Sequence, residues 1–392
     1  MTDLLIRLEM SNYTFCDLED FKKHYKENIH GYLSLTVCVF GSIANVFNIC
    51  VLRTKQMRSP TNYILTGLAV ADLLVMLQYI PFTIHRSLVN KPLYYTHFNY
   101  LWAVYYKFHA LFTLILHFIA CCLTIILAIW RYVYISRLHA NKICSDERKT
   151  IIAIMTAYIV CPVLCIPMIS TSQIVAYPQT CDLNGVIVAK DNRNKYNSSE
   201  LKNETIFLLY PNDPFQLSIW VYSLLLKLLP CVLLTVLSYK IITALLETRR
   251  RRIKLLTSCQ PLDDLSRSSM SNRVHVYKDT QADRTTKMLL AVLFLFLLTE
   301  FPQGIMGQIS AIYGDAFLKE CYSAFGEIMD IVALINSSIN FILYCTMSRQ
   351  FRATFEEMFN IRQIVDWLMW IKRPLPKKVQ EDNGIETKMS LV

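Results

Sequence analysis

Seven long apolar stretches constrain the fold of this chain more than any other feature of its sequence. They cover residues 32–52, 63–84, 102–135, 151–172, 216–246, 288–312 and 324–346. A helix needs roughly 20 apolar residues to cross about 30 Å of hydrocarbon. The 392 residues are 54% hydrophobic and 18% charged, whereas charged residues make up about 25% of a soluble domain. We therefore predict an all-α membrane protein, built as a seven-transmembrane helix bundle.

Basic residues in the connections set the expected orientation. Arg53, Lys55 and Arg58 follow the first stretch without an acidic residue, and four arginines at 249–252 follow the fifth. Such loops stay in the cytoplasm, so we expect a multi-pass protein of the plasma membrane with its N-terminus outside and its C-terminus in the cytoplasm. The net charge of +10 then gathers at the inner face, where membrane lipid rather than nucleic acid is the expected partner.

Glycosylation sequons and cysteines fit this orientation. A sequon at Asn336 falls within a membrane stretch and is discounted, which leaves three in the outer parts, at Asn12, Asn197 and Asn203. Three cysteines also fall in these parts, namely Cys16, Cys181 and Cys321. An oxidising exterior favours one disulfide among them with one thiol left over, and the sequence leaves the pair open.

Polar residues inside the apolar stretches predict which faces point into the bundle. His117, Thr124 and Arg131 recur every seven residues and so share one helical face. Asn45 and Asp72 lie in the first two stretches. A second polar stripe lies within the seventh stretch and consists of Glu327, Asp330, Ser337, Asn340 and Tyr344. Ionisable residues at membrane depth predict functional sites. The alternatives are a structural polar cluster and, for Arg131, an anchor at the membrane interface.

Prolines within or near the ends of the stretches predict bent helices. They stand at positions 81, 162, 167, 230 and 302. Each proline leaves a backbone carbonyl without its helical partner and permits a bend. Bent helices with polar faces suit a bundle that has two arrangements.

Taken together, the motifs resemble those of the rhodopsin-like (class A) G protein-coupled receptors over residues 32–359. The matching features are Asn45, the LAVAD segment that ends at Asp72, Arg131 with Tyr132, Pro230 and Pro302, and Asn340 with Tyr344. More narrowly, the chain resembles invertebrate receptors for myosuppressin and related FMRFamide-like peptides. The strings that carry this likeness are HGYLSLTVCVFGSIAN, MRSPTNYILTGLAVADLLVM, KFHALF, LAIWRY, DRTTKMLLAVLFLFLLTEFPQGI and ALINSSINFILYC.

The resemblance implies how the chain is divided. Residues 1–31 would form an extracellular segment and residues 32–347 the receptor domain. Residues 348–360 would form a short amphipathic helix on the membrane surface, and residues 361–392 a cytoplasmic tail. A heterotrimeric G protein, of the inhibitory class, is the implied partner. The terminal residues Ser390, Leu391 and Val392 also match a PDZ-domain ligand.

Several positions depart from the wider family. Trp130 replaces the acidic residue before Arg131, Glu300 stands at the tryptophan position of the sixth stretch, and Phe341 replaces a proline in the seventh. Ala120 replaces a hydroxyl that often completes a sodium site, so no firm metal site is predicted near Asp72. Residues 104–106 contain no cysteine, which removes the family's common bridge to Cys181.

The resemblance also implies an amidated peptide ligand that ends in Arg-Phe-amide and enters from outside. Glu300, Glu327 and Asp330 are expected to receive its arginine, since a carboxylate pairs well with a guanidinium. Glu300 could instead stay protonated and bond within the bundle. The expected stacking and hydrogen-bonding residues are Tyr79, His109, Phe112, His117, Gln303 and Gln308.

Receptor activation is expected to use a second set of residues towards the inner side. Its members are Asp72, Trp130, Arg131, Tyr132, Pro302, Asn336, Asn340 and Tyr344. Because Trp130 removes the local acidic partner, Arg131 is expected to pair with Asp283.

Other functions fit the sequence less well. The seventh stretch contains no lysine for retinal, and no paired repeat suggests a transporter. A seven-helix channel stays an alternative, as does a receptor for another short neuropeptide. An amine receptor would usually carry an aspartate near Thr113, and this chain has none. No catalytic motif is present, so neither an enzyme nor a cofactor is expected.

Overall fold

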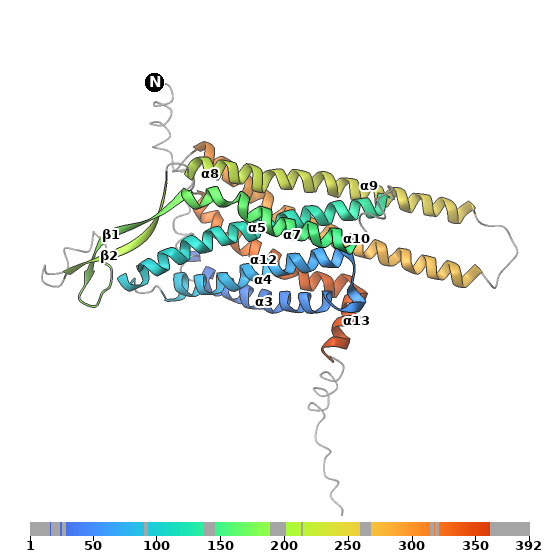
Figure 1. Ribbon diagram of the computed structural model, residues 1–392, viewed down its shortest axis with the longest axis horizontal. Helices are drawn as coiled ribbons and strands as arrows, with labels where there is room; N and C mark the ends of the chain where they lie inside the picture. The colour runs from blue at the N-terminus through green and yellow to red at the C-terminus, as the bar shows by residue number, and fades with distance from the viewer. Residues whose placement is uncertain are drawn as a thin grey trace, which may run out of the picture.

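A computed structural model describes residues 16, 24–25, 29–89, 93–136, 146–188, 201–212, 215–258, 268–313, 317 and 321–360. Within this part of the chain, seven helices are long and apolar enough to span a membrane. They lie side by side in one elongated bundle (Figure 1). The predicted seven-helix membrane fold is confirmed.

The helices follow the apolar stretches in order. Those of the first half are α3 (Gly31–Leu52), α4 (Pro60–Thr83), α5 (Tyr100–Ser136) and α7 (Glu147–Leu164). Those of the second half are α8 (Phe215–Val221), the π-helical segment η8 (Tyr222–Leu228), α9 (Leu229–Ser258), α10 (Ser268–Tyr313) and α12 (Ser323–Met347). The chain from α8 through η8 into α9 makes one membrane crossing. The short helix α13 (Arg349–Met358) follows α12.

Local sequence explains several helix boundaries. The Ser59 hydroxyl accepts a hydrogen bond from the Asn62 amide before α4, and Asp146 accepts from the Arg148 amide before α7. Such caps satisfy amides that the first turn of a helix leaves free. The fourth stretch was expected to continue to residue 172, but α7 ends at Leu164 and a 3-10 segment (Ile166–Thr171) that contains Pro167 follows it.

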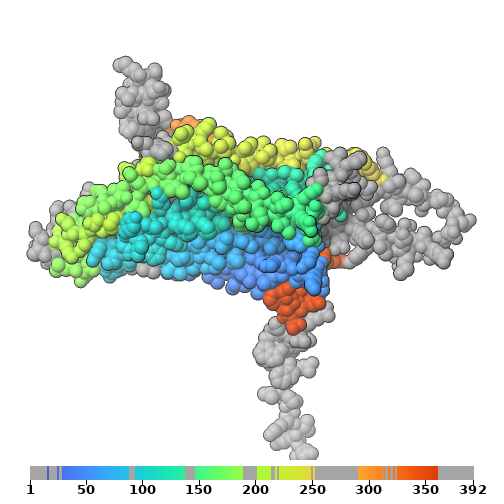
Figure 2. All heavy atoms as spheres, in the orientation of Figure 1, coloured from blue at the N-terminus to red at the C-terminus, as the bar shows by residue number. Residues whose placement is uncertain are grey.

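The amphipathic helix after the seventh span is also confirmed. The Ser348 hydroxyl caps α13 by accepting from the Phe351 amide. Phe351 is 1% exposed and packs with Tyr344 and Phe341 of α12, while Phe355 contacts Phe47 of α3. Figure 2 shows α13 against one end of the bundle, next to α3. We call this the α13 end.

A β-hairpin marks the opposite end, which we call the hairpin end. Strands β1 (Ser172–Asp182) and β2 (Leu201–Pro211) pair antiparallel, from Ser172 opposite Pro211 to Asp182 opposite Leu201. The hairpin extends beyond the helices (Figure 1). Backbone hydrogen bonds tie the turn after β1 to the connection between α4 and α5: the Ile187 amide donates to the Leu93 carbonyl, and the Tyr95 amide to the Gly185 carbonyl.

Gly185 makes this tie possible. Its φ of +82° lies in the left-handed region, and an added Cβ would stand 2.9 Å from the Tyr95 ring. The Lys107 ammonium of α5 adds a second tie by donating to the Ser172 carbonyl at 2.7 Å. The hairpin is thereby joined to α5 without a disulfide.

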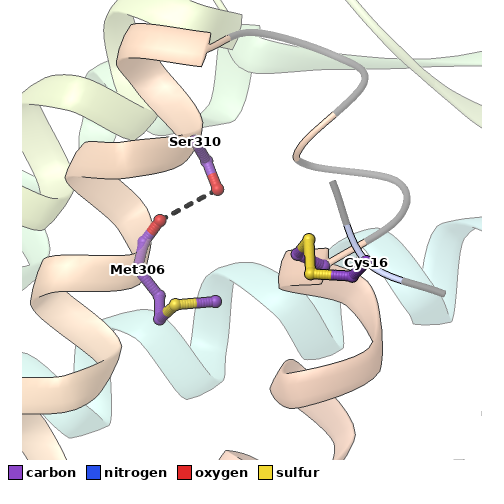
Figure 3. Close-up of a disulfide and its surroundings, with 4 residues drawn as sticks. Cys16, Met306 and Ser310 are labelled. Atoms are coloured by element: carbon purple, nitrogen blue, oxygen red, sulfur yellow. Dashed lines mark hydrogen bonds between the residues drawn. A yellow bond between two sulfur atoms is a disulfide. The ribbon is translucent and has the colours of Figure 1, made fainter. Parts of the chain in front are cut away.

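One disulfide links the N-terminal segment to the start of the seventh span. Cys16 and Cys321 are bonded across a sequence separation of 305 residues. Figure 3 shows the bond beside the segment of α10 that carries Met306 and Ser310. Cys181 is the leftover thiol, and it is fully buried in β1. This pairing resolves the choice that the sequence left open.

We predict that Cys181 resists alkylation in the native protein. Burial, followed by the nearby carboxylates of Glu204 and Asp182, raises the pKa of its thiol. A raised pKa keeps the thiol protonated to higher pH, so little reactive thiolate is present at pH 8. Mass spectrometry after maleimide treatment should find Cys181 unmodified in the folded protein and modified after denaturation. Rapid native labelling would contradict the buried position.

Candidate functional site

The most unusual polar cluster in the bundle joins three membrane-spanning segments through two buried charges. Lys227 of η8 donates to Glu300 Oε2 of α10 at 2.5 Å and to Gln303 Oε1 at 2.8 Å. His117 Nε2 of α5 lies 2.6 Å from Glu300 Oε1 and 2.8 Å from Lys227 Nζ. According to its tautomer, the imidazole either donates to Glu300 or accepts from Lys227. We call these four side chains the ionic cluster.

Close helix packing brings the cluster together. An added Cβ at Gly304 of α10 would lie 2.9 Å from Leu228, and one at Gly307 would lie 2.6 Å from Ser223. The two glycines therefore allow α10 to approach η8 more closely than larger residues would. Gln308 strengthens the contact, because its amide donates to the Ser223 hydroxyl at 2.7 Å and to the Trp220 carbonyl at 3.0 Å.

Lys227 is a residue that our sequence reasoning missed. It is the partner of Glu300, which was expected either to receive a ligand or to stay protonated. A detectable signal existed, since a lysine within an apolar membrane stretch needs a partner inside the bundle. The sequence alone did not indicate that this partner is an acidic residue 73 positions later.

The two other acidic residues predicted for the ligand lie on α12 near the hairpin end, in contrasting surroundings. Glu327 lies 2.9 Å from Arg86 Nη2 and 3.2 Å from His30 Nε2. Asp330 is exposed. Among the described residues it makes no hydrogen bond or ion pair.

Aromatic rings from α4 and α5 form a second feature of the hairpin end. The His109 ring stacks on Phe82 with centroids 3.8 Å apart, and Tyr79 lies 5.3 Å from both rings. His109 Nδ1 also contacts Gln78 Oε1 at 2.5 Å. Phe112 stacks instead with Phe108, at 5.0 Å. Tyr79 and His109 are buried, whereas Phe82 and Phe112 are half-buried.

The middle of the bundle holds the expected polar residues together. Asn340 Nδ2 donates to Asp72 Oδ2 at 3.2 Å, and Asn45 Nδ2 donates to the Ser337 carbonyl at 3.0 Å. Asn336 Nδ2 lies 3.4 Å from the Thr299 hydroxyl of α10. In the part of the chain that the structure describes, no group of three or more histidine, cysteine or acidic side chains could hold a metal ion.

At the α13 end, Trp130 has a different partner from Arg131. The Trp130 indole donates to the Thr150 hydroxyl of α7 at 3.2 Å. Arg131 is 8% exposed, and its guanidinium lies 5.4 Å from the centre of the Tyr134 ring. Trp130 thus fastens α5 to α7 and leaves Arg131 beneath the surface of the bundle.

Other predicted residues are spread over the molecule or lie outside the described part. Tyr344 is buried, and Lys240 lies 5.9 Å from the Tyr132 ring. Pro302 lies within α10, and Asn203 is exposed on β2. The following lie outside the described residues or have side chains that the structure does not describe: Asn12, Asn197, Asp283, Ser390, Leu391 and Val392.

A family model decides what kind of protein this arrangement belongs to. The model of the serpentine type 7TM GPCR chemoreceptor Srw matches residues 32–362. The chain belongs to the G protein-coupled receptors. It is therefore a multi-pass protein of the plasma membrane and a receptor rather than an enzyme.

Individual relatives agree with this assignment. The Caenorhabditis elegans G-protein coupled receptor dmsr-1 is 32% identical over 354 residues, which cover 84% of this chain and 68% of the relative. The Drosophila melanogaster sex peptide receptor is 27% identical over 365 residues, covering 90% and 78%. Squid rhodopsin shares the fold, with a TM-score of 0.61 at 15% identity over 94% of this receptor and 93% of rhodopsin. The resemblance to rhodopsin-like receptors is confirmed.

We predict that Gly307→Ala destabilises the receptor while Gly326→Ala does not. The added methyl group at position 307 would meet Ser223 and force α10 away from η8, at a cost of about 1–3 kcal/mol in the free energy of unfolding. Gly326 has nothing within 4 Å of an added Cβ, and alanine favours a helix. Thermal unfolding of the purified variants would test this pair. Equal stability of both variants would contradict the close contact.

Proposed function

We propose that this receptor binds an amidated peptide of the myosuppressin-like, Arg-Phe-amide class at its hairpin end and activates a heterotrimeric G protein of the inhibitory class at its α13 end. The hairpin end would face the outside, with residues 1–31 extracellular and residues 361–392 cytoplasmic. The exposed Asn203 on β2 would then be open to glycosylation, as its sequon requires.

The observation that carries the peptide proposal is the exposed, unpartnered carboxylate of Asp330. A charged side chain within a membrane span is costly unless a partner compensates it. No described residue makes a hydrogen bond or an ion pair with Asp330, so a cation from outside is the natural complement. An arginine guanidinium fits well, because it can donate two parallel hydrogen bonds to one carboxylate.

The contacts of the three acidic residues distinguish their roles in ligand binding, which the sequence alone did not. Glu300 is held by Lys227, and Glu327 lies against Arg86 and His30. A ligand would have to displace these cations before it could use either carboxylate. We therefore propose Asp330 as the main contact for the ligand arginine, with Glu327 helping to attract it.

The aromatic rings of α4 and α5 supply a surface for the ligand's phenylalanine. Phe82 is half-buried; its ring centre lies 5.4 Å from the Arg86 guanidinium, and its ring stacks on His109. Phe112 offers a second half-buried ring. The buried Tyr79 and His109 would support these rings from behind. Tyr79 also packs with Ile331, the residue after Asp330, in one hydrophobic cluster.

The relatives support a peptide ligand. The sex peptide receptor of Drosophila melanogaster is named for a peptide, and it aligns with 90% of this receptor. The inhibitory coupling and the myosuppressin-like ligand rest on the motifs described above. We also propose that α13 lies on the inner membrane surface and that the C-terminal residues bind a PDZ-domain protein.

The G protein would meet Arg131 and Tyr344 after the α13 end opens. Both side chains are buried in this structure, at 8% and 2% exposure. A peptide that binds more tightly to an open arrangement would shift the population towards it. Trp130, Tyr132, Asn336 and Asn340 lie in the contacts that such a movement would have to remodel.

The first test is a screen of amidated peptides on cells that express this receptor, with dissociation of each G protein class as the readout. Activation by Arg-Phe-amide peptides through the inhibitory class is the expected result. Responses only to peptides without a basic residue would favour another neuropeptide. A peptide-gated current without G protein activity would favour a channel.

We predict that Asp330→Asn lowers the potency of an active arginine peptide by roughly tenfold to 100-fold, because a charged hydrogen bond contributes about 1.5–3 kcal/mol. Replacing the arginine of the peptide with neutral citrulline should lower its potency on the native receptor by a similar factor. When the Asp330→Asn receptor is tested with the citrulline peptide, the two losses of potency should not add up, because both changes remove the same ion pair.

Glu204→Gln is the matched control. Glu204 lies on β2 at the same end and pairs with Lys202, so the potency of the peptide should not change. If Asp330→Asn reduced the potency of the arginine and citrulline peptides by equal factors, Asp330 would not be the arginine contact.

A further inference from the structure

We propose that the ionic cluster is the lock that holds this receptor in its closed arrangement, with Lys227 as the positioning residue that the lock depends on. This inference goes beyond the choice of peptide, because it concerns the receptor without ligand. The juxtaposition that carries it is a buried lysine, glutamate and histidine on three different membrane-spanning segments.

The two charges of the lock are buried. Lys227 is 3% exposed and Glu300 is 2% exposed. Their mutual contact at 2.5 Å and the contacts to Gln303 and His117 compensate both charges. Separating the pair would leave one uncompensated charge on each side in a low-dielectric interior, which is strongly unfavourable. Each segment is therefore held in register with the others.

The ionic cluster lies close to prolines in both the fifth and the sixth membrane-spanning segments. Glu300 lies two residues before Pro302, which interrupts the helical hydrogen bonds and permits a bend. Lys227 lies in the π-helical segment η8, three residues before Pro230. The ion pair thus bridges two neighbouring helices close to a proline in each of them.

Side-chain packing along α10 connects the cluster to the α13 end. On the side of Pro302 nearer the α13 end, α10 packs against two other helices. Its residues Leu293 and Phe296 contact a cluster that includes Cys121 and Ala128 of α5 and Leu234 of α9. This packing keeps α10 close to α5, the helix that carries the buried Arg131. A displacement of this part of α10 away from α5 would bend or rotate the helix near Pro302 and therefore strain the contact between Glu300 and Lys227.

A ligand would reach the lock through its two less buried members. His117 retains 24% side-chain exposure, and Gln303 is half-buried. A ligand group that bonded to either side chain would compete with Lys227 and Glu300 for it. Binding at the hairpin end could thereby weaken the contact between α10 and η8 without touching the α13 end.

The test measures signalling without peptide in cells that express Lys227→Met, Glu300→Gln and the combined double variant. The readout is G protein dissociation divided by the amount of receptor at the cell surface. We expect basal signalling to rise about fivefold or more in each variant, the smallest effect typical of coupling between two conformations. A merely structural cluster would lower the amount of receptor and leave signalling per receptor unchanged.

The double variant protects the test against misfolding. Either single substitution leaves a lone buried charge, whereas the double variant has neither charge. The double variant should therefore be more stable than the sum of the two single effects predicts. Its thermal unfolding temperature should therefore exceed that of the weaker single variant, while its basal signalling stays raised.

Lys107→Met is the matched control. Lys107 is also a lysine in the half of the bundle nearer the hairpin end, but its partner is the Ser172 carbonyl rather than a carboxylate. Its basal signalling should equal that of the native receptor. The proposal is overturned if the double variant reaches the surface and signals no more per receptor than Lys107→Met does.

Discussion

A hydrocarbon environment cannot solvate polar groups, and this constraint governs nearly every polar contact inside the receptor. Helices satisfy their own backbone groups, so the seven crossings can pass through lipid. Polar side chains must instead find partners between helices. Asp72 accepts a hydrogen bond from Asn340, Asn45 donates to the Ser337 carbonyl, and Lys227 donates to Glu300. These pairings join α3 and α4 to α12, and η8 to α10.

The same requirement explains how much the sequence reveals. Apolar length predicts the seven crossings, and helical periodicity predicts that Asn340 and Arg131 face inward. The cost of a charge in lipid predicts the same for Asp72. Periodicity gives the inward face but not the residue on the opposite helix. The pairing of Lys227 with Glu300 and the bond between Cys16 and Cys321 join positions far apart in the chain. They depend on how the segments pack, which no local pattern records. The contrast between bound Glu327 and unpartnered Asp330 was hidden for the same reason.

Departures from the wider family become intelligible through their contacts. Trp130 replaces an acidic residue and bonds to Thr150, so it holds α5 against α7. Phe341 replaces a proline and packs with Phe47, Phe351 and Phe355, which ties α12 to α3 and α13. Backbone bonds join the hairpin to the connection before α5, and Lys107 joins it to α5 itself, instead of a disulfide. In each case another interaction connects the elements.

The bond between Cys16 and Cys321 also changes the topology of the molecule. It closes the chain into a covalent ring that includes the first six membrane crossings and excludes the seventh. A single protease cut anywhere within the ring, for example between β1 and β2, would leave both pieces attached to each other until a reducing agent is added. The receptor would then migrate as one species under oxidising conditions and as two after reduction.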